Sequence, residues 1–359
     1  MDYSKGLIAF TAIIVGVITY SAYKMLGFGG NQFPVNGKTI LITGASEGLG
    51  RSIAIQLAQK GANVVIASRS AHKLQAAIAD IQAAAANSST QRFHFISADL
   101  TDPDAADRLL NETTAWNNGV APDVVWCCAG YCHPGLFIDV PIKTLRDQMD
   151  TVYWTSAYTA HATLRRWLVP VSQSATSKEQ QPPPRHLIFT ASTLAFVAVS
   201  GYGPYAPPKA AMRNLSDVLV QEIEMYNGAR RKKDANAPAT DVKIHIVFPM
   251  GMTSPGFENE QKLKPEVTHI MEEADKPQLP EEVATIAIKG LERGDFQIIT
   301  NTVGQIMRTS ALGPSPRNNI FLDTAASWLS NLVFLFVIPD LAKKAFNYGK
   351  EKGIPSAKA

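Results

Sequence analysis

Cysteine is scarce in this chain of 359 residues, and its three copies are Cys127, Cys128 and Cys132. They lie close together in one apolar stretch, whereas a secreted disulfide-rich domain has more cysteines and spreads them along the chain. A metal site would need paired spacings with histidines nearby, and His133 alone follows the cluster. The sequence therefore predicts reduced, partly buried thiols and no metal site.

A strong excess of one charge is also missing. The formal net charge is +3, from 34 lysines and arginines against 31 aspartates and glutamates. A protein that binds nucleic acid would show a larger basic excess, with basic and aromatic residues interleaved on one surface. We therefore expect no nucleic-acid partner.

Few runs are both long and apolar, and one of them is "LIAFTAIIVGVITYSAY" at 7–23, flanked by Lys5 and Lys24. A membrane-spanning helix needs about 17 to 25 residues. The alternative is a cleaved signal peptide, but no clear small-residue cleavage site precedes the folded part. We predict an N-terminal transmembrane helix within a membrane anchor at 1–27, whose orientation the two lysines leave open.

A second apolar run, "WLSNLVFLFVIP" at 328–339, lies in a C-terminal extension that we place at 304–359. The run is short for a membrane-spanning helix. Its leucines and aromatic residues suit a membrane interface, although a buried core helix or a re-entrant segment would have a similar composition. The sequence predicts a membrane-associating segment here and leaves these three placements open.

Between these ends, short apolar runs alternate with amphipathic stretches. The runs that we expect to be buried strands cover 38–44, 63–69, 93–100, 123–130, 185–192 and 241–249. The stretches with helical spacing cover 51–61, 72–86, 104–116, 143–168 and 207–226. This alternation predicts an α/β fold, a Rossmann-like doubly wound parallel sheet with helices on both faces, over 37–300. Ligands of such sheets bind at the carboxyl ends of the strands.

A glycine-rich turn, "TGASEGLG" at 43–50, lies between the first strand and the first helix. Glycine allows a sharp turn and a close approach of bare backbone to a phosphate, which the N–H groups of the following helix attract. In this strand–turn–helix setting the motif predicts a dinucleotide site. The candidate cofactor-binding residues of the turn are Gly44, Ser46, Glu47, Gly48, Leu49 and Gly50.

The end of the second strand indicates which dinucleotide is bound. Enzymes that prefer NAD place an acid here for the ribose hydroxyls, but this chain has Arg69, with Lys73 in the next helix. Two cations suit a ribose 2′-phosphate, so we predict NADPH as the cofactor. Asp99 and Leu100 end the third strand at the same edge. The carboxylate of Asp99 could accept from an adenine amino group or simply cap the next helix.

The stretch "PYAPPKAAM" at 204–212 places Tyr205 four residues before Lys209. Prolines 207 and 208 fit only the first turn of a helix, so a helix begins at Tyr205 with Lys209 one turn further along. The phenol could donate a proton to a ketone oxygen, while Ser192 at the end of the fifth strand holds that oxygen. We expect Lys209 and the oxidised nicotinamide to lower the pKa of Tyr205.

Together these motifs resemble the short-chain dehydrogenase/reductase family over about 37–300. The matching features are T-G-x-x-x-G-x-G at 43–50, Asp99, the A-G at 129–130, the set Ser192/Tyr205/Lys209, and P-x-x-x-T from Pro249 to Thr253. The resemblance implies that Tyr205 is the acid/base of the reaction and that Lys209 binds the nicotinamide ribose. It also implies that Thr253 contacts the cofactor.

The stretch "FPMGMTSPGFENE" at 248–260 is similar to the P-x-x-x-T-x-P-G-F-x-x-E stretch of fungal 3-ketodihydrosphingosine reductases. This resemblance implies NADPH-dependent reduction of a long-chain lipid ketone at the endoplasmic reticulum membrane, with the catalytic domain facing the cytosol. It also implies possible homo-oligomers that pair through 143–168 and 207–226. Two alternatives stay open: a 3-ketoacyl-CoA or ketosteroid reductase, and a non-catalytic cofactor-binding scaffold.

Three positions depart from the family pattern. Cys127 stands where an asparagine is usual, and Pro207 and Pro208 replace small residues between the tyrosine and the lysine. Val152 stands where the family has an asparagine that holds a water of the proton relay. The last departure puts the proton relay in doubt more than hydride transfer, and it is the best support for the scaffold alternative.

Overall fold

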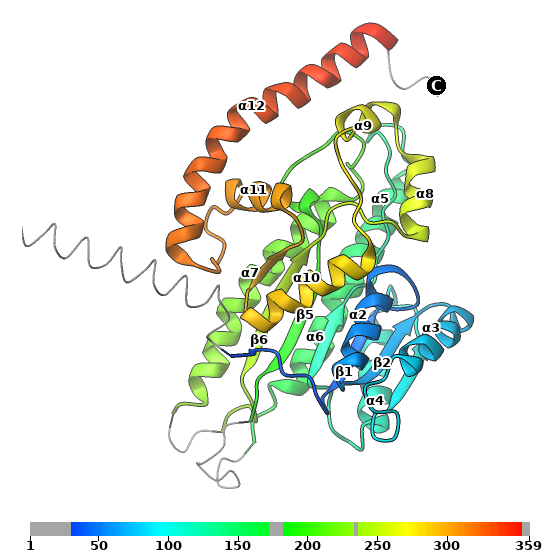
Figure 1. Ribbon diagram of the computed structural model, residues 1–359, viewed down its shortest axis with the longest axis vertical. Helices are drawn as coiled ribbons and strands as arrows, with labels where there is room; N and C mark the ends of the chain where they lie inside the picture. Colours follow the sequence, from blue (N-terminus) through cyan, green and yellow to red (C-terminus); the bar gives the residue numbers. More distant parts are fainter. Residues whose placement is uncertain (1–29, 172–181, 233–235, 354–359) are drawn as a thin grey trace, which may run out of the picture.

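The computed structural model describes residues 30–171, 182–232 and 236–353. The predicted membrane anchor at 1–27 lies outside the described residues. The sheet and the helices packed on it occupy the middle of the chain, and a long helix extends from them near the C-terminus (Figure 1).

The described residues contain one parallel sheet of seven strands in the order β3-β2-β1-β4-β5-β6-β7. The strands are β1 (Thr39–Thr43), β2 (Asn63–Ser68), β3 (Phe93–Ser97), β4 (Val124–Cys127), β5 (Arg185–Thr190), β6 (Val242–Phe248) and β7 (Gln297–Ile299). Strand β1 pairs with β2 on one side and β4 on the other, so the chain order reverses there. In open sheets of this kind the ligand crevice lies at that reversal.

Six strands lie within the predicted ranges, and the seventh, β7, was not predicted. It has three residues and pairs with β6 at the sheet edge. A run this short carries no periodic signal, and its first residue, Gln297, is polar although it is buried.

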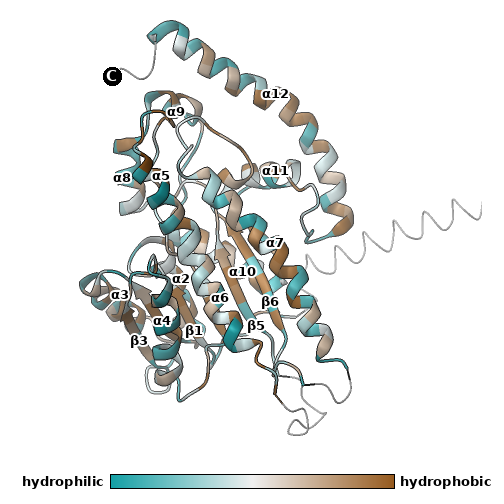
Figure 2. Cartoon of the chain, turned by 180° about the vertical axis from the view of Figure 1, so that it is seen from behind, coloured by the Kyte–Doolittle hydropathy of each residue, from teal (hydrophilic) through white to brown (hydrophobic). Residues whose placement is uncertain are grey.

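Helices cover both faces of the sheet, as predicted. On one face lie α2 (Gly48–Gln59), α3 (Ala71–Ala83) and α10 (Pro280–Arg293); on the other lie α4 (Pro103–Trp116), α6 (Thr155–Trp167) and α7 (Ala206–Ala229). Each face has its own apolar core, because Ile40 and Ile42 of β1 point to the first layer and Leu41 to the second. The strands are therefore apolar on both sides (Figure 2).

The helix predicted over 143–168 is continuous but changes its winding. It begins as α5 (Ile142–Gln148), passes through a π-helical turn at Met149–Trp154 and continues as α6. The hydroxyl of Thr151 donates to the carbonyl oxygen of Asp147 at 2.6 Å, and that of Thr155 donates to Thr151 at 3.0 Å. Threonines that bond back to the preceding turn in this way bend helices. The hydrophobic spacing does not reveal such a change.

Two short helices, α8 (Pro255–Leu263) and α9 (Glu266–Met271), follow β6 and lie beyond the carboxyl ends of the strands (Figure 1). Ser254 begins α8, because its Oγ accepts from the backbone N–H of Phe257 at 3.1 Å. Pro255 fits the first turn, where its missing N–H is not needed. These helices form one wall of the space described below.

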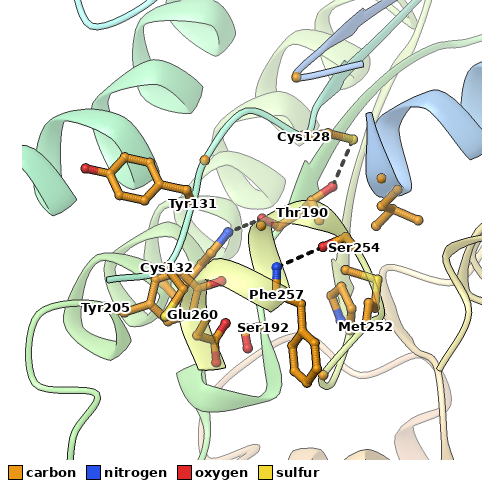
Figure 3. A pocket seen from close by; sticks show the side chains of 18 of the residues that line it. Cys128, Tyr131, Cys132, Thr190, Ser192, Tyr205, Met252, Ser254, Phe257 and Glu260 are labelled. Carbon is orange, nitrogen blue, oxygen red and sulfur yellow. Dashed lines mark hydrogen bonds between the residues drawn. The ribbon is translucent and has the colours of Figure 1, made fainter. Parts of the chain in front are cut away.

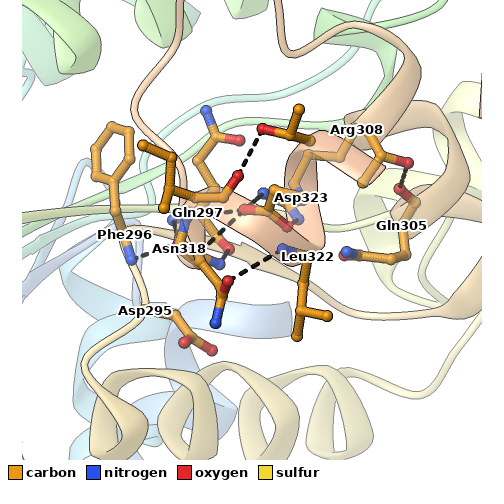
Figure 4. A network of polar contacts seen from close by, with 12 residues as sticks. Asp295, Phe296, Gln297, Gln305, Arg308, Asn318, Leu322 and Asp323 are labelled. Carbon is orange, nitrogen blue, oxygen red and sulfur yellow. Dashed lines mark hydrogen bonds and ion pairs between the residues drawn. The ribbon is translucent and has the colours of Figure 1, made fainter. Parts of the chain in front are cut away.

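A polar network ties the last two helices, α11 (Thr302–Ser310) and α12 (Ile320–Lys352), to the sheet (Figure 4). The side-chain oxygen of Asn318 accepts from the backbone N–H groups of Phe296 and Gln297, both at 2.9 Å, beside edge strand β7. Arg308 of α11 and Asp323 of α12 form an ion pair that is almost fully buried. Breaking such a pair leaves an uncompensated buried charge, so this contact fixes where α12 begins.

Helix α12 has 33 residues and is long and apolar enough to cross a membrane, by length and composition. It contains the predicted apolar segment 328–339, and Trp328 and Phe336 in that segment are 73% and 77% exposed. The possibility that 328–339 is a buried core helix is therefore wrong. Apolar residues run along the exposed part of the helix (Figure 2).

Candidate active site

A cavity of about 770 Å³ lies at the carboxyl edge of the strands. It brings together every predicted site residue except Thr253: Gly44, Ser46, Glu47, Gly48, Leu49, Gly50, Arg69, Lys73, Asp99, Leu100, Ser192, Tyr205 and Lys209. Residues that are far apart in the sequence thus line one space. We call the part near the glycine turn the cofactor end and the part near α8 and α9 the substrate end.

The glycine turn at the cofactor end requires its glycines. Gly44 has a φ of +67°, and a Cβ there would lie 2.6 Å from the backbone nitrogen of Ala129. A Cβ on Gly50 would lie 2.5 Å from the carbonyl oxygen of Gly44. The turn therefore packs directly on the strand behind it and presents bare backbone at the start of α2. This cradle fits a dinucleotide phosphate.

The cations predicted for the ribose 2′-phosphate have different surroundings. Among the described residues, the guanidinium of Arg69 has no hydrogen-bond or ion-pair partner, and the side chain is exposed at the cavity. The ammonium of Lys73 lies 2.7 Å from a carboxylate oxygen of Glu47. Arg69 is thus the more available of the two cations, since Lys73 shares its charge with Glu47.

Asp99 does not cap the next helix, because the N-cap of α4 is Asp102. Its Oδ1 accepts from the backbone N–H of Thr101 at 3.1 Å and from the hydroxyl of Thr101 at 2.8 Å. The carboxylate therefore holds the turn after β3, and the residue also lines the cavity. Its contact with an adenine group stays a prediction.

The catalytic candidates lie where β5 ends and α7 begins. Tyr205 is the N-cap of α7, with prolines in the first turn, as the sequence predicted. The ammonium of Lys209 lies 5.6 Å from the centre of the Tyr205 ring and donates to the carbonyl oxygen of Thr190 at 2.7 Å. Ser192 follows β5 at the same edge, and its Oγ accepts from the backbone N–H of Leu194. Phenol, hydroxyl and ammonium thus line one part of the cavity. Figure 3 shows Tyr205 and Ser192 there.

Burial dominates the electrostatics of this corner. Burial, followed by the charges of Cys132 and Glu260, raises the pKa of Tyr205 well above its usual value, and a hydrogen bond with Ser192 opposes the rise. Burial lowers the pKa of Lys209 to about 8. Without a cofactor the pKa of Tyr205 is therefore raised, because burial disfavours the phenolate, and the lowering expected from Lys209 with a bound oxidised nicotinamide stays a prediction. A protonated phenol at neutral pH is the form that can donate to a ketone oxygen.

Two residues that the sequence singled out, Thr253 and Val152, do not line the cavity. Thr253 is exposed, and its backbone N–H donates to the carbonyl oxygen of Gln278 at 3.0 Å, while its neighbours Met252 and Ser254 line the cavity. Its contact with the cofactor stays a prediction. Val152 is fully buried within the π-helical turn and does not line the cavity.

Polar side chains are present beside the catalytic corner, although the residue at 152 is an apolar valine. Thr151 and Thr155, on the same helix as Val152, both line the cavity. The hydroxyl of Thr190 lies 3.3 Å from the Cys128 sulfur at the end of the neighbouring strand. The cavity wall therefore offers hydroxyl groups on which a water could be held, even though no asparagine stands at 152.

The sequence reasoning missed a polar group at the substrate end, which we call the carboxylate cluster: Tyr202, Glu260, Lys264 and Glu272. The hydroxyl of Tyr202 donates to Glu260 at 2.7 Å and to Glu272 at 3.1 Å. The ammonium of Lys264 lies 2.7 Å from Glu272 and 3.4 Å from Glu260. The last glutamate of the stretch 248–260 is Glu260, so that motif was the one available signal.

Comparisons with known proteins agree with this geometry. A family model described as short chain dehydrogenase matches residues 38–230. A curated relative, 3-ketodihydrosphingosine reductase ksrA of Aspergillus fumigatus, is 58% identical over 358 residues, which cover 99% of this chain and 96% of that protein. The 3-ketodihydrosphingosine reductase gsl-3 of Neurospora crassa is 43% identical and covers 96% of this chain and 91% of its own length.

Solved structures show the same fold at low sequence identity. A short-chain type dehydrogenase/reductase from Mycobacterium ulcerans has a TM-score of 0.57 at 20% identity, over 74% of this chain and 89% of that one. A short-chain dehydrogenase from Streptomyces avermitilis has a TM-score of 0.57 at 21% identity, over 78% and 94%. These two likenesses concern the fold alone.

Proposed function

The chain belongs to the short chain dehydrogenase family, and from this premise we propose that it reduces 3-ketodihydrosphingosine to dihydrosphingosine with NADPH. One observation carries the proposal: the glycine turn, Arg69 and the set Ser192/Tyr205/Lys209 line a single cavity. The names of the curated relatives in Aspergillus fumigatus and Neurospora crassa support the choice of substrate. The exposed Arg69 and the lack of an acid at the end of β2 support NADPH over NADH.

The residues of the chain account for the proton side of the reaction. NADPH, when bound against the glycine turn, supplies a hydride to the carbonyl carbon. Ser192 holds the carbonyl oxygen by a hydrogen bond, and Tyr205 gives its proton to that oxygen, so the ketone becomes a secondary alcohol. The phenolate that remains is stabilised by the Lys209 ammonium below the ring and regains its proton from water in the cavity.

The scaffold alternative rests on Val152, and the structure weakens its support. Val152 is buried away from the cavity, whereas Thr151 and Thr155 line it. The residues that carry the proton in our proposal are all present and adjacent. A 3-ketoacyl-CoA or ketosteroid reductase would use the same residues, and the assay described below separates these substrates.

We also propose that α12 associates with a membrane. Asp323 and Ser330 near its start bond to α11, while Tyr348 and Lys352 near its end contact Glu266 of α9. Because both ends contact the folded domain, we infer that the apolar face lies along a bilayer surface rather than crossing it. Location at the endoplasmic reticulum with the catalytic domain facing the cytosol is part of this proposal, and so is pairing of two copies through 143–168 and 207–226.

The proposal is tested by following NADPH oxidation by the full chain in phospholipid vesicles. Three ketones are compared at equal concentration: 3-ketodihydrosphingosine, a 3-ketoacyl-CoA and a ketosteroid. We expect turnover of the sphingoid ketone and little turnover of the other two. Tight NADPH binding without turnover of any ketone would favour the scaffold, and preferred turnover of the second or third would favour another reductase.

A further inference from the structure

The carboxylate cluster is buried more deeply than a solvated surface network. The side chain of Lys264 is 4% exposed, and those of Glu260 and Glu272 are 16% and 18% exposed. The phenol of Tyr202 bridges the two carboxylates. Each carboxylate is therefore held in place from two sides, by a phenol and an ammonium, in a region where charge interactions are stronger than at the surface.

The formal charges of the cluster do not cancel. Glu260 and Glu272 together carry two negative charges, and Lys264 carries one positive charge. Tyr202 does not change this sum, because burial and the two carboxylates raise its pKa far above its usual value. Nor does Cys132, whose thiol pKa is raised well above its usual value by burial and by Glu260. The cluster thus has one negative charge without a matching cation among its members.

Residues at the mouth of the cavity do not supply that cation. Glu273, Asp275, Lys276 and His269 also line the cavity at this end, and with the histidine neutral their formal charges add no positive excess. Glu273 is itself paired with Lys344 of α12. A ligand with one positive charge would complete the balance at the substrate end.

The cluster is close enough to the catalytic corner to contact the same substrate. The ring of Tyr202, whose hydroxyl donates to Glu260, lies with its centre 6.4 Å from the centre of the Tyr205 ring. The charge of Glu260 is also one of the causes that raise the pKa of Tyr205. Figure 3 shows Glu260 among Cys132, Tyr205 and Ser192 in one view of the cavity. A cation bound at Glu260 would therefore lie near the carbonyl group that Tyr205 protonates.

We propose that Glu260, supported by Glu272, binds the substrate ammonium group on the carbon next to the ketone. This inference rests on the proposed function, because 3-ketodihydrosphingosine carries such an ammonium and a 3-ketoacyl-CoA or ketosteroid does not. The contact fixes the ketone carbon two bonds from the anchored nitrogen, so that its oxygen faces Tyr205 and Ser192. Lys264 and Tyr202 act as positioning residues that hold the two carboxylates toward the cavity.

The test compares two ketones of equal chain length in the full chain reconstituted in vesicles. One is 3-ketodihydrosphingosine, and the other is 1-hydroxyoctadecan-3-one, which has hydrogen in place of the ammonium. We expect kcat/KM of the unsubstituted protein to be higher for the amino ketone by about tenfold or more, the usual size of a charge-assisted hydrogen bond. In Glu260→Gln this preference should fall to within about threefold of equality.

Two further variants make the result specific. Glu260→Asp keeps the charge and should keep most of the preference, which a merely structural role of the side chain would not explain. Glu258→Gln is the matched control, because Glu258 is exposed on the same helix and does not line the cavity. Fluorescence titration with NADPH should give the same Kd for all these proteins, which excludes unfolding as the cause.

The outcomes separate the inference from the function. If Glu260→Gln retains the preference, or lowers kcat/KM of both ketones by the same factor, the ammonium site is refuted while the reductase activity stands. Turnover of neither ketone by the unsubstituted protein, with NADPH bound, would overturn the proposed function and the ammonium site with it.

Discussion

The two ends of the cavity differ in charge and in construction. The cofactor end is formed by turns that directly follow strands, with Gly44 packed on Ala129 and Arg69 exposed without a partner among the described residues. The substrate end is formed by α8, α9 and the turn before α7, and it has an excess negative charge. At the cofactor end the charges of Arg69 and Lys73 are balanced by those of Glu47 and Asp99. The negative substrate end would therefore attract a cationic lipid base and repel a polyanionic dinucleotide. Tyr205 lies between the two ends.

The largest effect is expected where the two ends meet. Tyr205→Phe removes the proton donor but leaves both ends intact, so kcat should fall by about a thousandfold, within the range of general acid catalysis. The Kd of NADPH, measured by fluorescence titration, should stay within a few-fold. Tyr226→Phe is the control, because Tyr226 is exposed at the far part of α7 and does not line the cavity. Normal turnover by the Tyr205 variant would remove this residue from the mechanism.

A change at the cofactor end should alter the choice of dinucleotide. Arg69→Asp places a negative charge beside the 2′-phosphate, so the Kd of NADPH should rise by about a hundredfold while that of NADH stays nearly constant. Arg165→Asp serves as the control, since Arg165 is exposed on α6 outside the cavity lining. Equal weakening of both dinucleotides would show that Arg69 does not read the phosphate.

The dependence of the reduction rate on pH should report the titration of Lys209, which lies beside Tyr205 between the two ends. Burial lowers the pKa of Lys209 from 10.5 to about 8, so the ammonium is charged below that pH and neutral above it. The reduction rate should therefore fall as pH rises through 8, by about tenfold per pH unit at the alkaline limit. In Lys209→Arg any residual activity should lack this fall, because arginine keeps its charge. An unchanged profile in the variant would assign the titration to another group.

The smallest effect is expected outside both ends, on α12. Trp328→Asp combined with Phe336→Asp should weaken binding to phosphatidylcholine vesicles several-fold in a flotation assay, because two exposed apolar side chains become charged. Activity on a detergent-dispersed ketone should not change. Val120→Asp is the control, since Val120 is an exposed apolar residue elsewhere. Unaltered flotation would assign membrane binding to another segment, such as the predicted anchor at 1–27.

The cofactor end could be predicted from sequence because each of its parts is local. A glycine turn and the residue that follows β2 each occupy a fixed place in a strand–helix unit, and so does the tyrosine four residues before a lysine that lies between the two ends. The alternation of apolar runs then places these units at one edge of a parallel sheet. The direction of the Tyr205 pKa shift could not be predicted in this way, because it depends on how deeply the folded chain buries the phenol.

The substrate end could not be predicted because its residues are not linked by a regular spacing in the sequence. Tyr202, Glu260, Lys264 and Glu272 come from three segments that meet only after folding. The same limit applies to β7, which is too short to show a pattern. It applies also to the π-helical turn, in which Thr151 lines the cavity and Val152 does not. Local sequence motifs therefore indicate the residues of the cofactor end, whereas the residues of the substrate end are brought together only by tertiary contacts.

The most direct test of the central claim follows the hydride itself into the lipid. The full chain in vesicles is given 3-ketodihydrosphingosine and NADPH that carries deuterium in place of the transferred hydrogen, and the product is analysed by mass spectrometry. We predict dihydrosphingosine with one deuterium on the carbon that was the ketone, and almost none with Tyr205→Phe. Unlabelled product, or no product while NADPH remains bound, would contradict the claim that this cavity transfers hydride to a sphingoid ketone.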